Sequence, residues 1–113
     1  MRAGKHRLRP AQRHMEIYQL RYLVGVAEAL NYTKAANTLH VSQSALSRQI
    51  ILLEKELGVR LFDRNRQRVS LTDDGRVVLA RSKRILAEVS ALTAAAKDLA
   101  EGRGGEVILS CSW

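Results

Sequence analysis

The sequence predicts a mainly α-helical domain of three helices and a two-stranded β-hairpin, followed by one long helix. Apolar residues recur at helical spacing as far as Leu57, nearly alternate between Val59 and Leu71, and repeat every seven residues from Val78 onward. The chain has 113 residues, enough for one small domain, and only 4% are aromatic. We therefore expect a small and largely aliphatic core.

Two helices are predicted at the start of the domain. The first ends near Leu30, and the second is short and buries Ala35 and Ala36, whose small side chains allow two helices to cross at close range. Either Asn31 or Thr33 can cap the second helix. The apolar residues of the first helix are Ile17, Leu20, Leu23, Val24 and Ala27.

A third helix is predicted between Ser42, as its N-cap, and Leu57, with Gly58 as the residue that ends it. Its inner stripe falls within an arc of about 60° on a helix of 3.6 residues per turn. The stripe consists of Leu46, Ile50, Leu53 and Leu57.

The segment VRLFDRNRQRVSL then reads as two short strands joined by a polar turn around Asn65 and Arg66. Two helices with a tight connection, the second carrying a polar N-terminal face, are typical of a helix-turn-helix. The strands that follow make it a winged helix-turn-helix, which we place at residues 15–72.

The last helix is predicted over residues 73–100, with Thr72 as its cap and Asp73 and Asp74 in its first turn. A heptad seam along it favours pairing with the same helix of a second subunit, although packing onto the first helix of the same chain is an alternative. Residues 101–113 are expected to form a hinge and one short strand. The seam consists of Val78, Ser82, Ile85, Val89, Leu92, Ala96 and Leu99.

Positive charge is distributed unevenly. The formal net charge is +8, and five basic residues without any acid lie in residues 1–14, which leaves +3 for the rest. This segment is expected to be disordered. It is either a basic arm that follows the phosphate backbone or minor groove of DNA, or an extension that precedes the usual translation start at Met15.

The outer side of the third helix begins with four hydrogen-bonding side chains and no acid. These lie within an arc of about 140°, and an α-helix fits the major groove of DNA. Glutamine can pair with adenine, arginine with guanine, and serine with bases or phosphates. The predicted base contacts are Gln43, Ser44, Ser47 and Arg48.

Phosphate contacts are predicted around this surface, at the start of the second helix, at the cap of the third and in the wing. They are Thr33, Lys34, Ser42, Arg64, Arg66 and Arg68. Ile51 and Leu52 follow the polar face and could meet thymine methyl groups, the long helix or another chain.

The sequence lacks the residue patterns that other classes of function require. Cys111 is the only cysteine, so no intrachain disulfide or thiolate metal cage is possible. Zinc spacing, a glycine-rich phosphate loop and a carboxylate pair do not occur, and Ser47 has no neighbouring base that would activate it. We expect neither an enzyme nor a metal or cofactor site, no membrane span, and a cytoplasmic location.

The run YTKAANTLHVSQSALSRQIILLEKELGVRLFDRNRQRVSLTDDGR resembles the DNA-binding domain of LysR-type transcriptional regulators, and the similarity extends over roughly residues 15–100. The resemblance implies a winged helix-turn-helix, a linker helix that pairs with a second subunit, and a larger effector-binding domain after it. EVILSCSW resembles only the first strand of that domain, so we expect no small-molecule response from these residues alone. Ser44, Ile51 and Gln67 depart from common family residues.

These observations predict a homodimeric, sequence-specific module that binds double-stranded DNA. A protein-interaction module that captures a full-length regulator in an inactive heterodimer is the alternative. Nonspecific binding of nucleic acid is a third, looser possibility, and it predicts no sequence preference.

Overall fold

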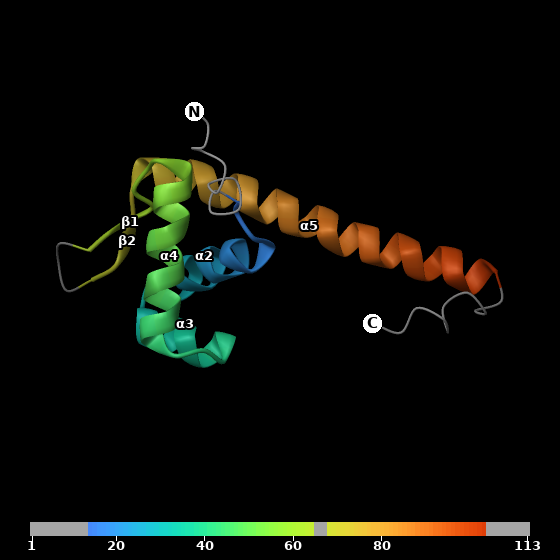
Figure 1. Ribbon diagram of the computed structural model, residues 1–113, viewed down its shortest axis with the longest axis horizontal. Coiled ribbons are helices and arrows are strands. Elements are labelled where there is room, and N and C mark those ends of the chain that lie inside the picture. The colour runs from blue at the N-terminus through green and yellow to red at the C-terminus, as the bar shows by residue number, and fades with distance from the viewer. Residues whose placement is uncertain (1–13, 65–67, 104–113) are drawn as a thin grey trace, which may run out of the picture. The chain divides into compact units, whose positions relative to one another are not determined.

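A computed structural model describes residues 14–64 and 68–103. Arg66, most of the basic N-terminal segment and the strand expected near the C-terminus lie outside the described residues. The chain divides into two compact units, and the boundary along the sequence falls between Lys83 and Arg84. The elements, shown in Figure 1, are α2 (Ile17–Ala29), α3 (Tyr32–Leu39), α4 (Gln43–Leu57), β1 (Phe62–Asp63), β2 (Ser70–Leu71) and α5 (Asp73–Gly102).

The ends of the helices follow from local capping chemistry. The side chain of Asn31, rather than Thr33, caps α3 by accepting from the backbone N–H of Lys34 at 2.8 Å. Ser42 caps α4 as predicted, since its hydroxyl oxygen accepts from the N–H of Ala45 at 3.1 Å. Gly58 ends α4 in the left-handed conformation with φ of 77°.

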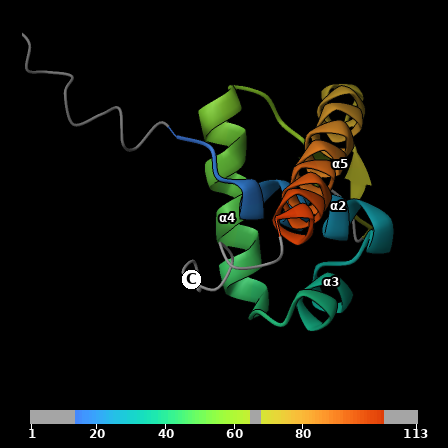
Figure 2. The same ribbon diagram turned by 90° about the vertical axis from the view of Figure 1, so that its right-hand side faces the viewer.

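The core of the first unit lies among α2, α3 and α4, with α3 beside the N-terminal end of α4 (Figure 2). A methyl group on Gly25 of α2 would lie 2.9 Å from Cδ1 of Leu39, so these two helices approach closely. The side chain of Leu39 therefore fills the space beside Gly25, and a larger residue at position 25 would have to displace it. The buried apolar residues of the three helices are Leu20, Leu23, Val26, Ala35, Ala36, Leu46, Ile50 and Leu53.

The wing is a short antiparallel hairpin in which Phe62 pairs with Leu71 and Asp63 with Ser70. Thr72 fastens it to α5: its N–H donates to the carbonyl of Leu61 at 3.0 Å, and its hydroxyl oxygen accepts from the N–H of Gly75 at 2.8 Å. The predicted cap of the long helix is therefore also the end of the hairpin. Helices α2 to α4 with this hairpin form a winged helix-turn-helix.

The second unit consists, within the described residues, of the part of α5 that begins at Arg84. The helix continues to Gly102, slightly beyond the predicted residue 100. Ile85, Leu92 and Leu99 are exposed along it. Across the described residues, every helix is too short or too polar to cross a membrane.

Candidate nucleic-acid interface

The recognition surface, which we define as Gln43, Ser44, Ser47 and Arg48, lies open on the first turns of α4. Three of these residues are exposed, and Ser47 is half-buried. On the other side of the helix, Leu46, Ile50 and Leu53 of the inner stripe are fully buried, and Leu57 is half-buried. The fold therefore keeps the four predicted side chains together and accessible.

Gln43 is held in place by a contact from α3. The hydroxyl of Thr33 donates to Oε1 of Gln43 at 3.1 Å. An amide oxygen has two lone pairs, so Gln43 retains one acceptor and both N–H donors, which is the combination that adenine requires. Within the described residues, Arg48 has no hydrogen-bond or ion-pair partner, so its guanidinium is also free to bind a base.

The predicted phosphate contacts of α3 and α4 differ in which hydrogen-bonding groups remain available to DNA. A hydroxyl has one proton, and that of Thr33 is directed to Gln43, so Thr33 can offer DNA only its backbone N–H. The backbone N–H of Lys34 is used by the Asn31 cap, but its ammonium is exposed. The hydroxyl oxygens of Ser42 and Ser44 lie 3.3 Å apart, and either can donate to the other.

Arg64 lies against the body of the domain rather than extending freely from the wing. Its Nη2 donates to the hydroxyl of Tyr32 at 3.0 Å, and both terminal nitrogens lie 3.4 Å from Oε1 of Glu54. Its guanidinium also lies 5.8 Å from the centroid of the Tyr32 ring. The side chain of Arg64 is 28% exposed, so little of it faces solvent.

Glu54 is the residue that the sequence analysis missed. It is 8% exposed, and its Oε2 accepts from the backbone N–H groups of Leu61 at 2.7 Å and Phe62 at 3.2 Å. One buried carboxylate on α4 thus binds the start of the wing and its arginine together. Its position in the sequence could have revealed this role, because Glu54 follows Ile50 by one helical turn and therefore lies on the buried side of the helix.

The same cluster shifts two ionisation equilibria. Burial raises the pKa of the Tyr32 hydroxyl, against the opposing influence of Arg64. Burial alone would lower the pKa of Arg64, but the hydrogen bond that Arg64 donates to Tyr32 and the charge of Glu54 outweigh it and raise the pKa. Both groups therefore keep their ordinary protonation states at neutral pH.

The remaining basic residues of the wing that the structure describes are Arg60 and Arg68. Nη2 of Arg60 donates to the carbonyl of Phe62 at 3.4 Å, and its side chain remains exposed. Arg68 is exposed as well. The described part of the wing thus exposes both Arg60 and Arg68, while Arg64 faces inward and Arg66 lies outside the described residues.

The predicted seam on α5 is only partly open. Within the first unit, Ser82 is 1% exposed and its hydroxyl donates to the carbonyl of Val78 at 2.8 Å. Within the second unit, Ile85, Leu92 and Leu99 are 39%, 69% and 61% exposed. The open part of the seam therefore begins at Ile85.

The order of these elements agrees with a known protein family. The profile described as "Bacterial regulatory helix-turn-helix protein, lysR family" matches residues 17–76, from the start of α2 to the first turn of α5. The chain belongs to the LysR family. The resemblance seen in the sequence is thereby confirmed, and this family consists of regulators of transcription rather than enzymes.

Individual LysR-family proteins are similar over most of the chain. The transcriptional regulator TfdT of Cupriavidus pinatubonensis is 42% identical over 95 residues, which are 84% of this chain and 42% of TfdT. The regulator CysB of Burkholderia cenocepacia is 41% identical over 100 residues, or 87% of this chain and 32% of that protein. The chain thus spans less than half the length of these relatives.

The fold also matches a solved structure of a LysR-family DNA-binding domain. The BenM domain in complex with the catB site 1 DNA has a TM-score of 0.76 and 38% identity, covering 79% of this chain and 96% of that one. This agreement confirms the winged helix-turn-helix fold class.

Proposed function

We propose that this chain binds double-stranded DNA sequence-specifically as the DNA-binding module of a LysR-family regulator. The observation that carries the proposal is the recognition surface: an acid-free group of amide, hydroxyl and guanidinium side chains on a capped helix, open to a partner. The BenM domain to which it is similar is a domain in complex with DNA. Membership of a family of regulators further supports this function.

Within this proposal, the recognition surface contacts base edges and a ring of polar groups contacts phosphates. The Lys34 ammonium, the exposed Arg68 and the hydroxyl of Ser42 are the phosphate contacts best supported by their surroundings. We retain Thr33, Arg66 and Arg64 in this set, with the difference that Arg64 also binds Glu54 and Tyr32. Such contacts position the domain without specifying sequence.

We further propose that the chain forms a homodimer through α5. The open part of the seam places exposed leucines one heptad apart, at Leu92 and Leu99, where a second helix would cover them. A dimer would present two recognition surfaces to two half-sites, and the paired helices would set the spacing between them.

Selection from a pool of random duplexes tests the proposed function directly. The chain is expected to enrich a defined sequence and to bind it more tightly than a scrambled duplex of the same composition. Because lysines and arginines displace counterions, the logarithm of the affinity should fall steeply with the logarithm of the salt concentration. Equal affinity for both duplexes at every salt concentration would contradict sequence-specific binding.

A protein-interaction module is the second candidate, and the exposed leucines of the seam favour it equally. In that case the chain would pair with a full-length relative and inactivate it. Copurification of a mixed dimer that has no affinity for the selected duplex would support this candidate. A mixed dimer that still binds the duplex would contradict it.

A further inference from the structure

One side-chain hydrogen bond connects the two helices of the helix-turn-helix at their exposed surface. The hydroxyl of Thr33, in the first turn of α3, donates to Oε1 of Gln43, the first residue of α4, at 3.1 Å. Both residues are exposed, so water can replace either partner and the bond adds little to stability. What the bond fixes is the orientation of the Gln43 amide.

The orientation matters because the two ends of a glutamine amide differ. The oxygen only accepts and the NH₂ group only donates. An amide that turns freely can therefore donate to N7 of a purine or, turned over, accept from the N4 amino group of cytosine. A fixed amide can do only one of the two.

In this chain the nitrogen is the end of the Gln43 amide that remains free. Thr33 holds Oε1, and among the residues that the structure describes none accepts from Nε2. The nitrogen can donate to N7 of adenine, and the second lone pair of Oε1 can accept from its N6 amino group. Cytosine offers only a donor in the major groove, so it has nothing to accept from this nitrogen.

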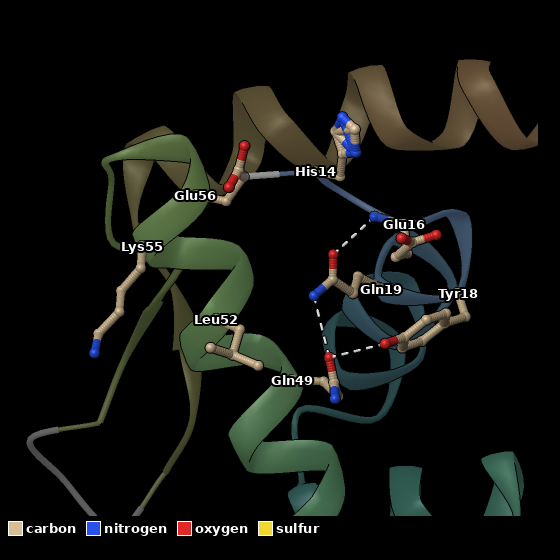
Figure 3. A pocket seen from close by; sticks show the side chains of 8 residues that line it. All are labelled: His14, Glu16, Tyr18, Gln19, Gln49, Leu52, Lys55 and Glu56. Carbon is tan, nitrogen blue, oxygen red and sulfur yellow. Dashed lines mark hydrogen bonds between the residues drawn. The ribbon is translucent and has the colours of Figure 1, made fainter. Parts of the chain in front are cut away.

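Helix α4 itself is held in place without the hydroxyl of Thr33. Its inner stripe is buried, and Gln49 joins it to α2: Oε1 of Gln49 accepts from Nε2 of Gln19 at 3.1 Å and from the hydroxyl of Tyr18 at 3.3 Å (Figure 3). Loss of the Thr33 hydroxyl would therefore release the amide of Gln43 and leave the helix that carries it in position.

We propose that Thr33 is a specificity-determining residue that acts through Gln43, favouring adenine over cytosine at the base that Gln43 contacts. Thr33 is a positioning residue, because its hydroxyl proton is used within the chain. Its backbone N–H lies in the first turn of α3, where it lacks an intrahelical partner, and stays available for a phosphate. The inference rests on the proposed function and adds a residue of α3 to those that determine the sequence bound.

Two substitutions at position 33 separate the hydroxyl from the rest of the residue. Thr33→Val keeps the shape and the backbone N–H but removes the donor, whereas Thr33→Ser keeps the donor. Thr38→Val is the matched control, because Thr38 is also exposed on α3 and lies about 140° around the helix from Thr33. Gln43→Ala identifies the base pair that Gln43 reads, as the position at which discrimination is lost.

The experiment measures dissociation constants for the selected duplex and for the three duplexes with another base pair at that position. The wild type and Thr33→Ser are expected to bind the adenine duplex about 5-fold or more tightly than the cytosine duplex. Thr33→Val should lower this ratio by about 2- to 10-fold, as for loss of one hydrogen bond, because the amide can turn over and accept from cytosine. Thr38→Val should leave the ratio unchanged.

A second comparison tests whether the effect passes through Gln43. In a chain that already carries Gln43→Ala, adding Thr33→Val is expected to change the affinity for none of the four duplexes, because no amide is left to orient. The dependence of affinity on salt concentration should also be the same for Thr33→Val and the wild type, since no phosphate contact is lost. Thermal unfolding of every variant reports whether the fold is retained.

The outcomes separate the inference from the proposed function. If the wild type selects a duplex but Thr33→Val weakens binding to all four duplexes equally, or acts equally with and without Gln43, the inference is wrong and the proposed function stands. A preference for cytosine at the position that Gln43 reads, or no loss of discrimination in Gln43→Ala, would overturn it as well. If the wild-type chain prefers no duplex, the proposed function fails and the inference fails with it.

Discussion

At the scale of single residues, hydrogen bonds inside the chain determine which groups remain for DNA. The hydroxyl proton of Thr33 is directed to Gln43, so at the start of α3 the ammonium of Lys34 is the stronger phosphate ligand. Sequence patterns place such residues near each other but do not show which donor is already in use. That depends on a contact between α3 and α4 that forms only when the two helices pack.

Gly75 is a residue whose importance is visible only in the packed structure. A Cβ at this position would collide with the backbone carbonyl oxygen of Leu61, which cannot move aside as a side chain can. We expect Gly75→Ala to lower the free energy of unfolding by about 1–3 kcal/mol, the usual cost of overpacking. Chemical denaturation monitored by circular dichroism measures it.

Gly102→Ala is the control for this prediction. Gly102 is also helical, and beyond its chain neighbours and its own helical backbone nothing described lies within 4 Å of the site of an added Cβ. The substitution is expected to be neutral or stabilising by up to about 1 kcal/mol, because alanine favours the helix. Equal stabilities of the two variants would contradict the close approach at Gly75.

At the scale of elements, the carboxylate of Glu54 connects the recognition helix to the wing. It binds two backbone N–H groups at the start of β1 and the guanidinium of Arg64, which in turn binds Tyr32 at the start of α3. Three elements thus share one hydrogen-bond network. The orientation of the wing relative to α4 depends on it.

Glu54→Gln is expected to destabilise the domain by about 1–3 kcal/mol, because a half-buried guanidinium loses its charged partner and an N–H donor replaces an acceptor. Glu56→Gln, two positions along the same helix and outside this network, should change stability by less than about 0.5 kcal/mol. Thermal and urea unfolding of both variants provide the comparison. Equal stability of Glu54→Gln and the wild type would show that the network does not hold the wing.

Most of the helical elements could be predicted from the sequence because their signals are local. Ser42 and Gly58 mark the ends of α4 by their own capping chemistry, and the inner stripe follows from spacing. Glu54 and Arg64 could not be paired in the same way, since their contact depends on how the wing folds back onto α4. For the same reason, the sequence predicted Arg64 only as a phosphate ligand.

At the scale of the whole molecule, the heptad seam was predicted as a single surface, but in the structure one part of it is buried and another part is exposed. Ser82 is already covered in the single chain, while Leu92 and Leu99 are exposed in the second unit. Spacing alone revealed the seam but not the point at which it opens. That point depends on which side chains the first unit covers.

Leu92→Glu is expected to weaken the proposed homodimer, since it would place a charge in the paired seam. The dimer dissociation constant from sedimentation equilibrium should rise by about tenfold or more, corresponding to about 1.4 kcal/mol. Ala94→Glu lies on another side of the same helix and should leave the constant unchanged. A wild-type chain that sediments as a monomer would contradict the proposal.

The central claim is that the recognition surface on α4 contacts base edges. The most direct test is the ratio of the dissociation constants for a scrambled and for the selected duplex, measured for the wild type, for Arg48→Ala and for Arg81→Ala at one salt concentration. Arg48→Ala is expected to lower this ratio by about 5-fold or more, as for loss of about 1–3 kcal/mol of base discrimination. Arg81→Ala, which removes an exposed arginine of α5, should leave the ratio unchanged. If Arg48→Ala weakens binding to both duplexes equally, Arg48 does not contact a base and the claim is contradicted.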